Sequence, residues 1–335
     1  MKITLCGGGS WGTAIARLLA NKGHDLNFYI RNKDVIEDIK KNKENTKYLP
    51  GAKFEKDINL TNDLESVLSD IDVFVIAVPT SSIRDILNQI KDKISKETII
   101  VNLSKGIEVE SLDRISEISA EVLKNNPFVA LSGPSHAEEV GKDIPTTVVA
   151  SSESLEVAQI IQNEFSTPIF RIYTNPDLVG VEMGGALKNI IALAAGMNDG
   201  LGYGDNSKAA LMTRGIYEMN KLGISLGANS HTFNGLSGIG DLIVTCTSMH
   251  SRNRRAGILI GEGKSMEEAC QEVGQVVEGV KTVKSAHKLA VVKNIEMPIT
   301  DALYRVLYEG YDPNKAVYEL MTRKNKDEIE QIFFE

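Results

Sequence analysis

The sequence predicts an α/β fold: a Rossmann-like, doubly wound and mainly parallel sheet in the N-terminal half, and an all-helical domain in the C-terminal half. Three observations lead to this prediction. A strand at the N-terminus runs into a glycine-rich turn and a helix, apolar runs then alternate with helical patterns, and this alternation stops near residue 176. At 335 residues the chain is long enough for two domains, which we place at 1–176 and 177–335.

The first unit consists of a strand beginning at Lys2, the glycines Gly7, Gly9 and Gly12, and a helix over residues 10–22. In such a unit the first glycine permits the tight turn, the second lets a pyrophosphate approach the backbone, and the third lets the helix pack against the sheet. The helix N-terminus adds unpaired N–H groups and a dipole that favour negative charge. The segment therefore predicts a dinucleotide site, although a glycine-rich turn without a ligand has the same spacing.

Strand-like and helical patterns alternate through the rest of this half. Runs such as Val73–Val78 are apolar at every position, which is typical of parallel strands covered on both faces. Residues 43–62 lack a clear period, and we expect an inserted loop with short strands there. The other predicted strands are 25–30, 98–103, 128–131, 146–150 and 169–173, and the predicted helices are 34–42, 63–69, 80–92, 111–124 and 153–164.

Ligands bind at the carboxyl ends of the strands in such a sheet, and three strand ends carry suitable residues. The second strand ends in Arg31 and Asn32, where a carboxylate would grip the ribose 2′-hydroxyl of NAD. Arg31 could instead pair with the 2′-phosphate of NADP, so we favour NADP with NAD tolerated, although a longer turn could bring Asp34 into reach. Residues 80–82 could cap the next helix. Lys105 would bring a cation to the cofactor or substrate unless it is a solvated loop lysine.

A fourth loop begins with Gly133 and Pro134. Ser135 and Glu138 follow in the spacing of a capping box, which would start a helix. A capped helix at this edge of the sheet could also offer N–H donors to a ligand. His136 lies in the same loop and is assigned no role.

The C-terminal half is expected to be helical from residue 177 to about 320, and Pro176 is a candidate hinge because proline can open a helix. Its first helix contains Gly184, Gly185 and Lys188. Glycines inside a helix cost about 1 kcal/mol each relative to alanine, so something must use the space that they leave. Lys188 either snorkels to water or occupies a pocket, where desolvation would lower its pKa into the range useful for a general acid or base.

Two later clusters could complement this lysine. Asp241 follows a glycine-rich turn, where it either caps the next helix or orients a cation such as Lys188. The segment Ser251–Asn253 places a hydroxyl, a guanidinium and an amide at a predicted helix N-terminus, a combination suited to phosphate. Arg254 and Arg255 could be solvated charges on that helix.

Composition excludes several classes of protein. The net charge of −8 argues against general nucleic-acid binding, and no apolar run approaches the roughly 20 residues that span a bilayer. The N-terminus lacks a signal-peptide layout, because Gly7 falls where the apolar region should lie. Cys6, Cys246 and Cys270 are far apart and odd in number, which favours neither a disulfide framework nor a metal site. We therefore expect a cytoplasmic protein.

Taken together, these motifs resemble those of the bacterial-type NAD(P)-dependent glycerol-3-phosphate dehydrogenase family, in the same order from residue 1 to about 320. The lysine helix and the Ser-Arg-Asn segment are the most specific parts, and Gly8 is a small departure because alanine is common there. The matching segments are Gly7–Ala14, Ser104–Gly106, Ser132–Ala137, Gly184–Asn189, Gly240–Leu242, Thr245–Thr247, Ser251–Arg255 and Val277–Val280.

The resemblance implies hydride transfer between NAD(P)H and carbon 2 of dihydroxyacetone phosphate, which gives sn-glycerol 3-phosphate for phospholipid synthesis, and it implies a homodimer. Lys188 would donate the proton in this direction and accept it in the reverse, with Asp241, Asn189 and Thr245 assisting. The resemblance places Lys105, Gly133, Ser135, Lys188, Asp241, Ser251, Arg252 and Asn253 around the substrate. Around the cofactor, NADP or NAD, it places Gly7, Gly9, Ser10, Trp11, Gly12, Arg31, Asn32, Tyr48, Lys105, Ala137, Arg252, Val276 and Glu278.

Physical chemistry agrees with these roles. Ketone reduction places negative charge on oxygen as the hydride arrives, so a positioned ammonium can stabilise that charge and supply the proton. The phosphate does not react, but its binding orients carbon 2. The nicotinamide carries the redox chemistry, so no metal is needed. Two alternatives remain open: a related hydroxyacid or ketopantoate-type reductase, because this fold hosts several substrates, and a catalytically silent NAD(P)-sensing module.

Overall fold

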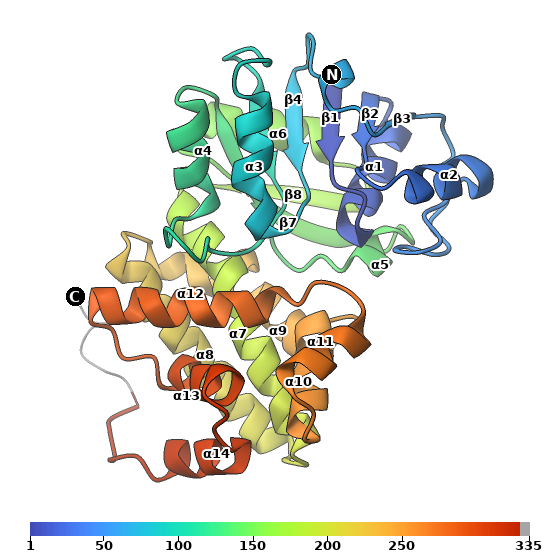
Figure 1. The fold of residues 1–335 in the computed structure, drawn as a ribbon. Coiled ribbons are helices and arrows are strands. Elements are labelled where there is room, and N and C mark those ends of the chain that lie inside the picture. The colour runs from blue at the N-terminus through green and yellow to red at the C-terminus, as the bar shows by residue number, and fades with distance from the viewer. Residues whose placement is uncertain (329–335) are drawn as a thin grey trace.

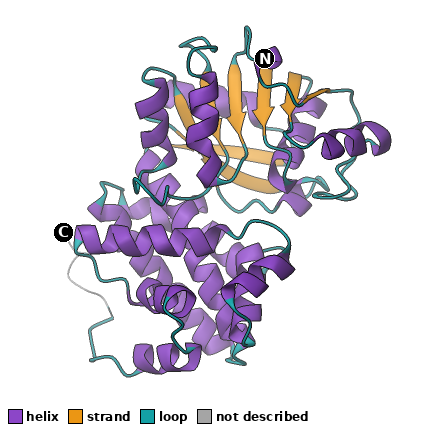
Figure 2. Cartoon of the chain, in the orientation of Figure 1, coloured by secondary structure: helices purple, strands orange, loops and turns teal. Residues whose placement is uncertain are grey.

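The computed structural model describes residues 1–328 and places an α/β region next to a helical region (Figure 1). All strands of the sheet lie between β1 (Lys2–Cys6) and β8 (Phe170–Asn175), and every described element after β8 is helical (Figure 2). The predicted fold class is therefore confirmed. The division at residue 176 stays a prediction, and the end of its second range lies outside the described residues.

The eight strands form one sheet in the order β3-β2-β1-β4-β5-β6-β7-β8. Neighbouring strands are parallel except for β6 and β7, which are antiparallel. Strands β2 and β3 lie on one side of β1, and β4 and the later strands lie on the other side, so the strand order reverses beside β1. The remaining strands are β2 (Asp25–Tyr29), β3 (Asn59–Thr61), β4 (Val73–Ile76), β5 (Ile99–Asn102), β6 (Phe128–Ser132) and β7 (Thr146–Ser151).

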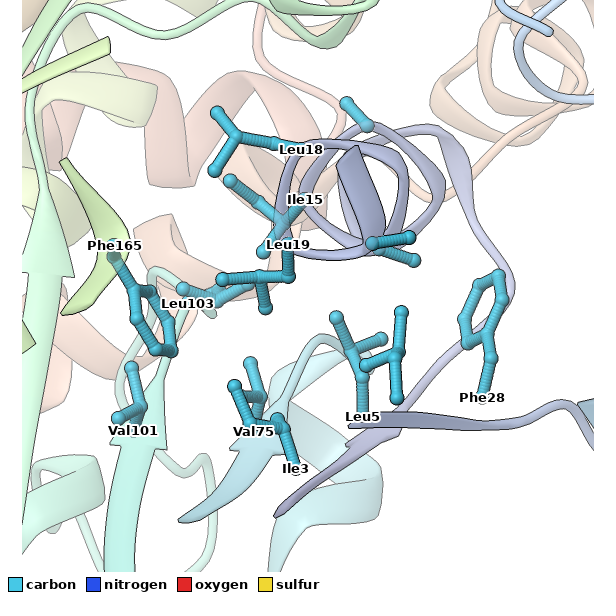
Figure 3. Close-up of a cluster of buried hydrophobic side chains, with 14 of the residues drawn as sticks. Ile3, Leu5, Ile15, Leu18, Leu19, Phe28, Val75, Val101, Leu103 and Phe165 are labelled. Atoms are coloured by element: carbon cyan, nitrogen blue, oxygen red, sulfur yellow. The ribbon is translucent and has the colours of Figure 1, made fainter. Parts of the chain in front are cut away.

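Helices cover both faces of the sheet because its central strands are apolar on both sides. In β4, Val75 joins a buried cluster with α1 (Ser10–Lys22) and α6 (Leu155–Phe165), part of which is drawn in Figure 3. Its neighbours Phe74 and Ile76 point to the opposite face, where they pack in a second cluster with α3 (Ile83–Ile90) and α4 (Ile115–Leu123). The short α2 (Lys33–Asn42) and α5 (Ala137–Val140) complete this region.

The helical region is organised around α7 (Leu178–Gly200), which runs from the sheet into the middle of the other helices (Figure 1). Within residues 1–328 this is the one helix long and apolar enough to cross a membrane, which composition did not anticipate. Of its most apolar window, 94% is buried inside the fold. The surrounding helices are α8 (Asp205–Ser225), α9 (Asp241–Thr247), α10 (Arg252–Gly261), α11 (Met266–Val273), α12 (Glu278–Lys293), α13 (Pro298–Tyr308) and α14 (Pro313–Met321).

Several predicted caps and helices were wrong in detail. The N-cap of α5 is His136 and makes no side-chain cap, while the Ser135 hydroxyl donates to the Gly133 carbonyl at 2.8 Å, so the predicted capping box does not form. Residues 80–82 form a 3₁₀ turn, and no side chain caps α3. The predicted helix at 63–69 is a single 3₁₀ turn, η1 (Glu65–Val67). The spacing of residues along the sequence therefore does not determine which side chains cap the helix N-termini.

Candidate active site

A cleft of about 1040 Å³ lies between the carboxyl edge of the sheet and the helical region. The ends of β1, β2, β4 and β5 supply one wall, and α7, α9, α10 and the segment leading into α12 supply the other. Of the predicted substrate and catalytic residues, Gly133 and Asp241 do not line it. The predicted residues that do line the cleft are Gly7, Gly9, Ser10, Trp11, Gly12, Arg31, Asn32, Tyr48, Lys105, Ser135, Ala137, Lys188, Asn189, Thr245, Ser251, Arg252, Asn253, Val276 and Glu278.

The glycine turn after β1 is shaped by backbone contacts that no side chain could enter. Gly7 has φ +127°, and a Cβ there would lie 2.2 Å from the carbonyl oxygen of Ala77. A Cβ on Gly12 would lie 2.0 Å from the carbonyl oxygen of Gly7, whereas a Cβ on Gly9 would face open space. No side chain caps α1, so its N-terminus is left open toward the cleft as a pyrophosphate site requires.

Two side chains beside this turn also fit a dinucleotide. Trp11 lines the cleft, and its indole Nε1 is buried without a hydrogen-bond partner among the described residues. Arg31 is exposed at the end of β2 and lines the cleft. Asn32 caps α2 by accepting from the Asp34 backbone N–H at 2.8 Å, and the Asp34 carboxylate does not line the cleft. The end of β2 thus presents a guanidinium and no carboxylate.

On the other wall, Lys188 lies in a pocket and does not snorkel to water, since only 6% of it is exposed. Its Nζ donates to Asp241 Oδ1 at 2.5 Å and to Thr245 Oγ1 at 2.7 Å. Burial lowers the pKa of Lys188 to about 8, with Lys105 acting in the same direction and Asp241 opposing. This ammonium is therefore poised to exchange a proton near physiological pH.

Gly184 and Gly185, which precede Lys188 in α7, allow neighbouring segments to pack closely against this helix. A Cβ on Gly184 would lie 2.6 Å from the carbonyl oxygen of Ser237, and one on Gly185 would lie 2.7 Å from Ser132 Oγ. Ser132 ends β6, and Ser237 belongs to a π-helical turn, η4 (Leu236–Gly240). The glycines thus let α7 approach the sheet on one side and the turn before α9 on the other.

Asp241 does not cap α9, because the N-cap position is Gly240 and no side chain fills that role. Instead its carboxylate joins two lysines: Oδ1 accepts from Lys188, and Oδ2 accepts from Lys105 Nζ at 2.6 Å. Burial alone would raise the pKa of Asp241, but the two lysines keep it below its usual value. Lys105 also donates to the carbonyl of Gly133 at 2.9 Å, so it is no solvated loop lysine. Asp241 and Gly133 stand behind the cleft and fix the cations that line it.

The segment at the start of α10 is held rigidly. Ser251 caps the helix by accepting from the Arg254 backbone N–H at 3.2 Å. Asn253 donates to Asn189 Oδ1 at 2.9 Å and accepts from the Gly279 backbone N–H at 2.8 Å, which joins α10 to α7 and α12. These contacts aim the N-terminus of α10 into the cleft, which Lys188 also lines.

Arg252 differs from its neighbours because its guanidinium has no hydrogen bond or ion pair within residues 1–328. Burial lowers its pKa, and Glu278 and Glu138 act in the opposite direction from a distance. A desolvated cation without a partner is costly unless an anion binds to it. Arg252 is therefore the natural anchor for an anionic ligand.

Arg254, predicted as a possible solvated charge, is instead built into the fold. Its Nε and Nη2 donate to Asp199 Oδ2 at 3.0 and 2.7 Å, and its Nη1 donates to the Thr247 carbonyl at 3.0 Å. Its own carbonyl oxygen would lie 2.0 Å from a Cβ on Gly196, so α10 crosses α7 at backbone contact here. Arg254 thus fixes the turn that leads into Ser251.

Some cleft residues were assigned no role from the sequence, and of these only His136 belongs to a segment that the sequence analysis singled out. His136 and His250 flank the substrate end, and Gln271 and Lys281 lie along the helical wall. Lys281 also donates to Ser81 Oγ at 3.0 Å across the cleft. The signal beside His136 was the spacing of Ser135 and Glu138, which predicted a helix cap and no cleft residue.

Comparisons with known proteins match nearly the whole chain to one family. Residues 2–158 and 177–318 match the models of the N-terminal and C-terminal parts of NAD-dependent glycerol-3-phosphate dehydrogenase. The chain is 56% identical to a glycerol-3-phosphate dehydrogenase [NAD(P)+] of Clostridium tetani, over 97% of this chain and 93% of that protein. It is 52% identical to the enzyme of the same name from a Thermoanaerobacter species, over 99% of this chain and all of that protein (100%).

Solved structures of two kinds resemble this chain, one at the level of both sequence and fold and one at the level of fold alone. The crystal structure of a glycerol-3-phosphate dehydrogenase from Coxiella burnetii superposes with a TM-score of 0.93 at 37% identity, covering 96% of this chain and 98% of that one. A ketopantoate reductase from Ralstonia eutropha superposes with a TM-score of 0.62 at 15% identity, covering 95% and 100% of the two chains. The second likeness is one of fold alone.

Proposed function

Because the chain belongs to the NAD-dependent glycerol-3-phosphate dehydrogenase family and is an NAD(P)-dependent oxidoreductase, we propose that its cleft reduces dihydroxyacetone phosphate to sn-glycerol 3-phosphate. The observation that carries this proposal is the buried amine of Lys188, held by Asp241 and Thr245 at the wall of a cleft that also contains the unpaired guanidinium of Arg252. Lys188 can act as a proton donor to a ketone, and Arg252 on the same wall can bind a phosphate, so the pair suits a ketone that bears a phosphate.

Lys188 is the general acid of the reduction and the general base of the reverse reaction. When bound, NAD(P)H supplies the hydride to carbon 2, and negative charge then develops on the carbonyl oxygen. The Lys188 ammonium stabilises that charge and donates its proton there. Asp241 keeps the amine oriented and Thr245 fixes its position, while Asn189 connects the same helix to Asn253.

The substrate phosphate binds at the start of α10. Arg252 supplies the charge, and the helix N-terminus supplies its dipole. The hydroxyl proton of Ser251 and the second amide proton of Asn253 remain available to donate. Lys105 and Ser135 face the phosphate from the sheet side. This binding energy orients carbon 2 toward the nicotinamide.

The sheet wall would hold the cofactor, with the glycine turn and the N-terminus of α1 suited to its pyrophosphate. Further cofactor contacts would come from Ser10, Trp11, Tyr48, Ala137, Val276 and Glu278, which line the cleft. Arg31 at the end of β2 supports a preference for NADP, with NAD tolerated.

We extend the proposal to the setting of the reaction. The chain acts as a homodimer and provides glycerol 3-phosphate for phospholipid synthesis, as its family resemblance implies. Its net charge of −8 supports the absence of nucleic-acid binding, and its three scattered cysteines support a cytoplasmic location. Its two ranges, 1–176 and 177–335, act as the cofactor-binding and the catalytic domain.

The direct test is the oxidation of NADPH by the purified protein with and without dihydroxyacetone phosphate. We expect oxidation only with the ketone. A folded protein that binds NADPH but leaves it unoxidised would support the sensing module instead. Arg252→Ala should raise the KM for dihydroxyacetone phosphate strongly, and an unchanged KM would refute its role as the phosphate anchor.

A further inference from the structure

His136 occupies a position at the substrate end of the cleft that the proposed roles do not use. It is the N-cap residue of α5, and its ring lines the cleft together with Lys188 and Ser251. Its Nε2 lies 3.4 Å from the carbonyl oxygen of Val244 in α9. A carbonyl oxygen only accepts hydrogen bonds, so this contact requires the proton to be on Nε2.

With the proton on Nε2, a neutral ring carries a bare acceptor at Nδ1. The structure gives Nδ1 no partner among residues 1–328. Burial lowers the pKa of His136 below its ordinary value, and the charge of Lys188 acts in the same direction, while Glu138 and Asp241 oppose. The ring is therefore neutral at physiological pH, and Nδ1 can accept.

His250 packs against this ring from the opposite wall. The two ring centroids lie 5.8 Å apart and the planes are inclined by 58°. His250 is exposed and directly precedes Ser251, whereas His136 is partly buried. The tilted ring contact and the bond to Val244 together hold the His136 ring between the two regions.

The substrate has three polar groups, and two of them already have partners. The phosphate needs donors, which Arg252 and the start of α10 supply, and the ketone oxygen needs the donor Lys188. The third group, the free hydroxyl beside the ketone, is itself a donor and needs an acceptor. The carboxylate of Asp241 accepts from Lys188 and Lys105 and does not line the cleft, so it lies out of reach of that hydroxyl.

We propose that His136 selects the substrate by its free hydroxyl group, with Nδ1 accepting the hydrogen bond from that hydroxyl. This inference rests on the proposed function of the cleft. It makes His136 a specificity-determining residue, which favours a hydroxymethyl ketone over the corresponding methyl ketone without taking part in proton transfer to carbon 2.

The test compares two substrates, dihydroxyacetone phosphate and its deoxy analogue hydroxyacetone phosphate, in wild type and in His136→Phe. A neutral hydrogen bond of this kind is worth about a tenfold change in kcat/KM. We expect wild type to prefer the hydroxylated substrate by about that factor. We expect His136→Phe to lose the preference by losing activity on dihydroxyacetone phosphate while keeping its activity on the analogue.

Further variants separate selection from a structural role. His136→Gln keeps an acceptor and should retain part of the preference, and it also serves if the phenylalanine variant does not fold. His231→Phe, an exposed histidine outside the cleft, is the matched control and should change neither substrate. Equal losses on both substrates, or an unchanged ratio in either His136 variant, would overturn the proposal. If wild type itself fails to reduce dihydroxyacetone phosphate, the proposed function fails instead.

Discussion

The two walls of the cleft differ in the groups that they present to a ligand. The sheet wall rests on a continuous apolar core and presents mainly backbone, at Gly7, Gly9 and the open N-terminus of α1. The helical wall presents buried charges and amides, above all Lys188 and the carboxylate of Asp241 behind it. Backbone recognition suits a cofactor whose charge stays constant, whereas proton transfer needs an ionisable group removed from water.

This difference explains where each wall is vulnerable. On the sheet wall the shape of the backbone matters, so a single added methyl group can block binding. On the helical wall the buried Lys188 and Asp241 depend on each other as partners, because an unpaired buried charge is strongly destabilising. Changes to the two walls should therefore produce different kinetic defects.

The largest effect should come from Lys188→Ala. We expect kcat for ketone reduction to fall by roughly 10²- to 10⁴-fold, because the general acid is lost. The dissociation constant for NADPH should stay near the wild-type value, since the nucleotide contacts lie mainly on the sheet wall. Fluorescence titration of NADPH and steady-state kinetics check the two halves of this prediction, and undiminished turnover would remove Lys188 from the mechanism.

The opposite defect should follow Gly7→Ala. The added methyl group meets the Ala77 carbonyl at a positive φ, so we expect a stability loss of about 1–3 kcal/mol and a cofactor affinity at least roughly tenfold weaker. Gly23→Ala is the matched control: its φ is +100°, but the nearest contact is the Lys56 ammonium at 3.8 Å. It should lose stability while it binds NADPH normally, and equal binding losses in both variants would contradict our account of the turn.

A smaller effect is expected from Arg254→Ala, which removes the tether of the turn before Ser251 without touching the cleft lining. The KM for dihydroxyacetone phosphate should rise about tenfold, since the loss of a charge-assisted hydrogen bond costs about 1.5–3 kcal/mol. The kcat should change little. Arg254→Lys should recover part of the loss, and Arg171→Ala, on the exposed face of β8, should have no effect. A fall in kcat at constant KM would contradict the positioning role.

The sequence predicted the sheet wall better than the helical wall, for physical reasons. Fully apolar runs such as Val73–Val78 identify buried strands, and strand ends then indicate where ligands bind. The sequence left Asp241 open between a helix cap and a partner of Lys188, and it did not indicate that Lys105 shares the same carboxylate. Lys105 and Asp241 are 136 residues apart, and local patterns hold no information about which distant lysines converge on one carboxylate.

Local rules also gave the wrong partners for polar groups. Asp241 and Ser135 stand in capping positions by spacing, yet one bonds two lysines and the other bonds the Gly133 carbonyl. The role of Arg254 depends on the backbone contact between α7 and α10. Gly196 and Gly257 permit this contact, but their presence in the sequence does not predict it. For Ser135 and Arg254 the sequence therefore did not indicate the partner, whereas for Asp241 the structure shows the second of the two predicted alternatives, the contact with Lys188.

The dependence of kcat on pH tests the role of Lys188 most directly. Burial lowers the pKa of this amine to about 8. Reduction needs the protonated form and oxidation needs the neutral form. We therefore predict that kcat for dihydroxyacetone phosphate reduction falls as the pH rises through about 8, while kcat for glycerol 3-phosphate oxidation rises through the same ionisation. Rates that stay level across this range in both directions would contradict the account.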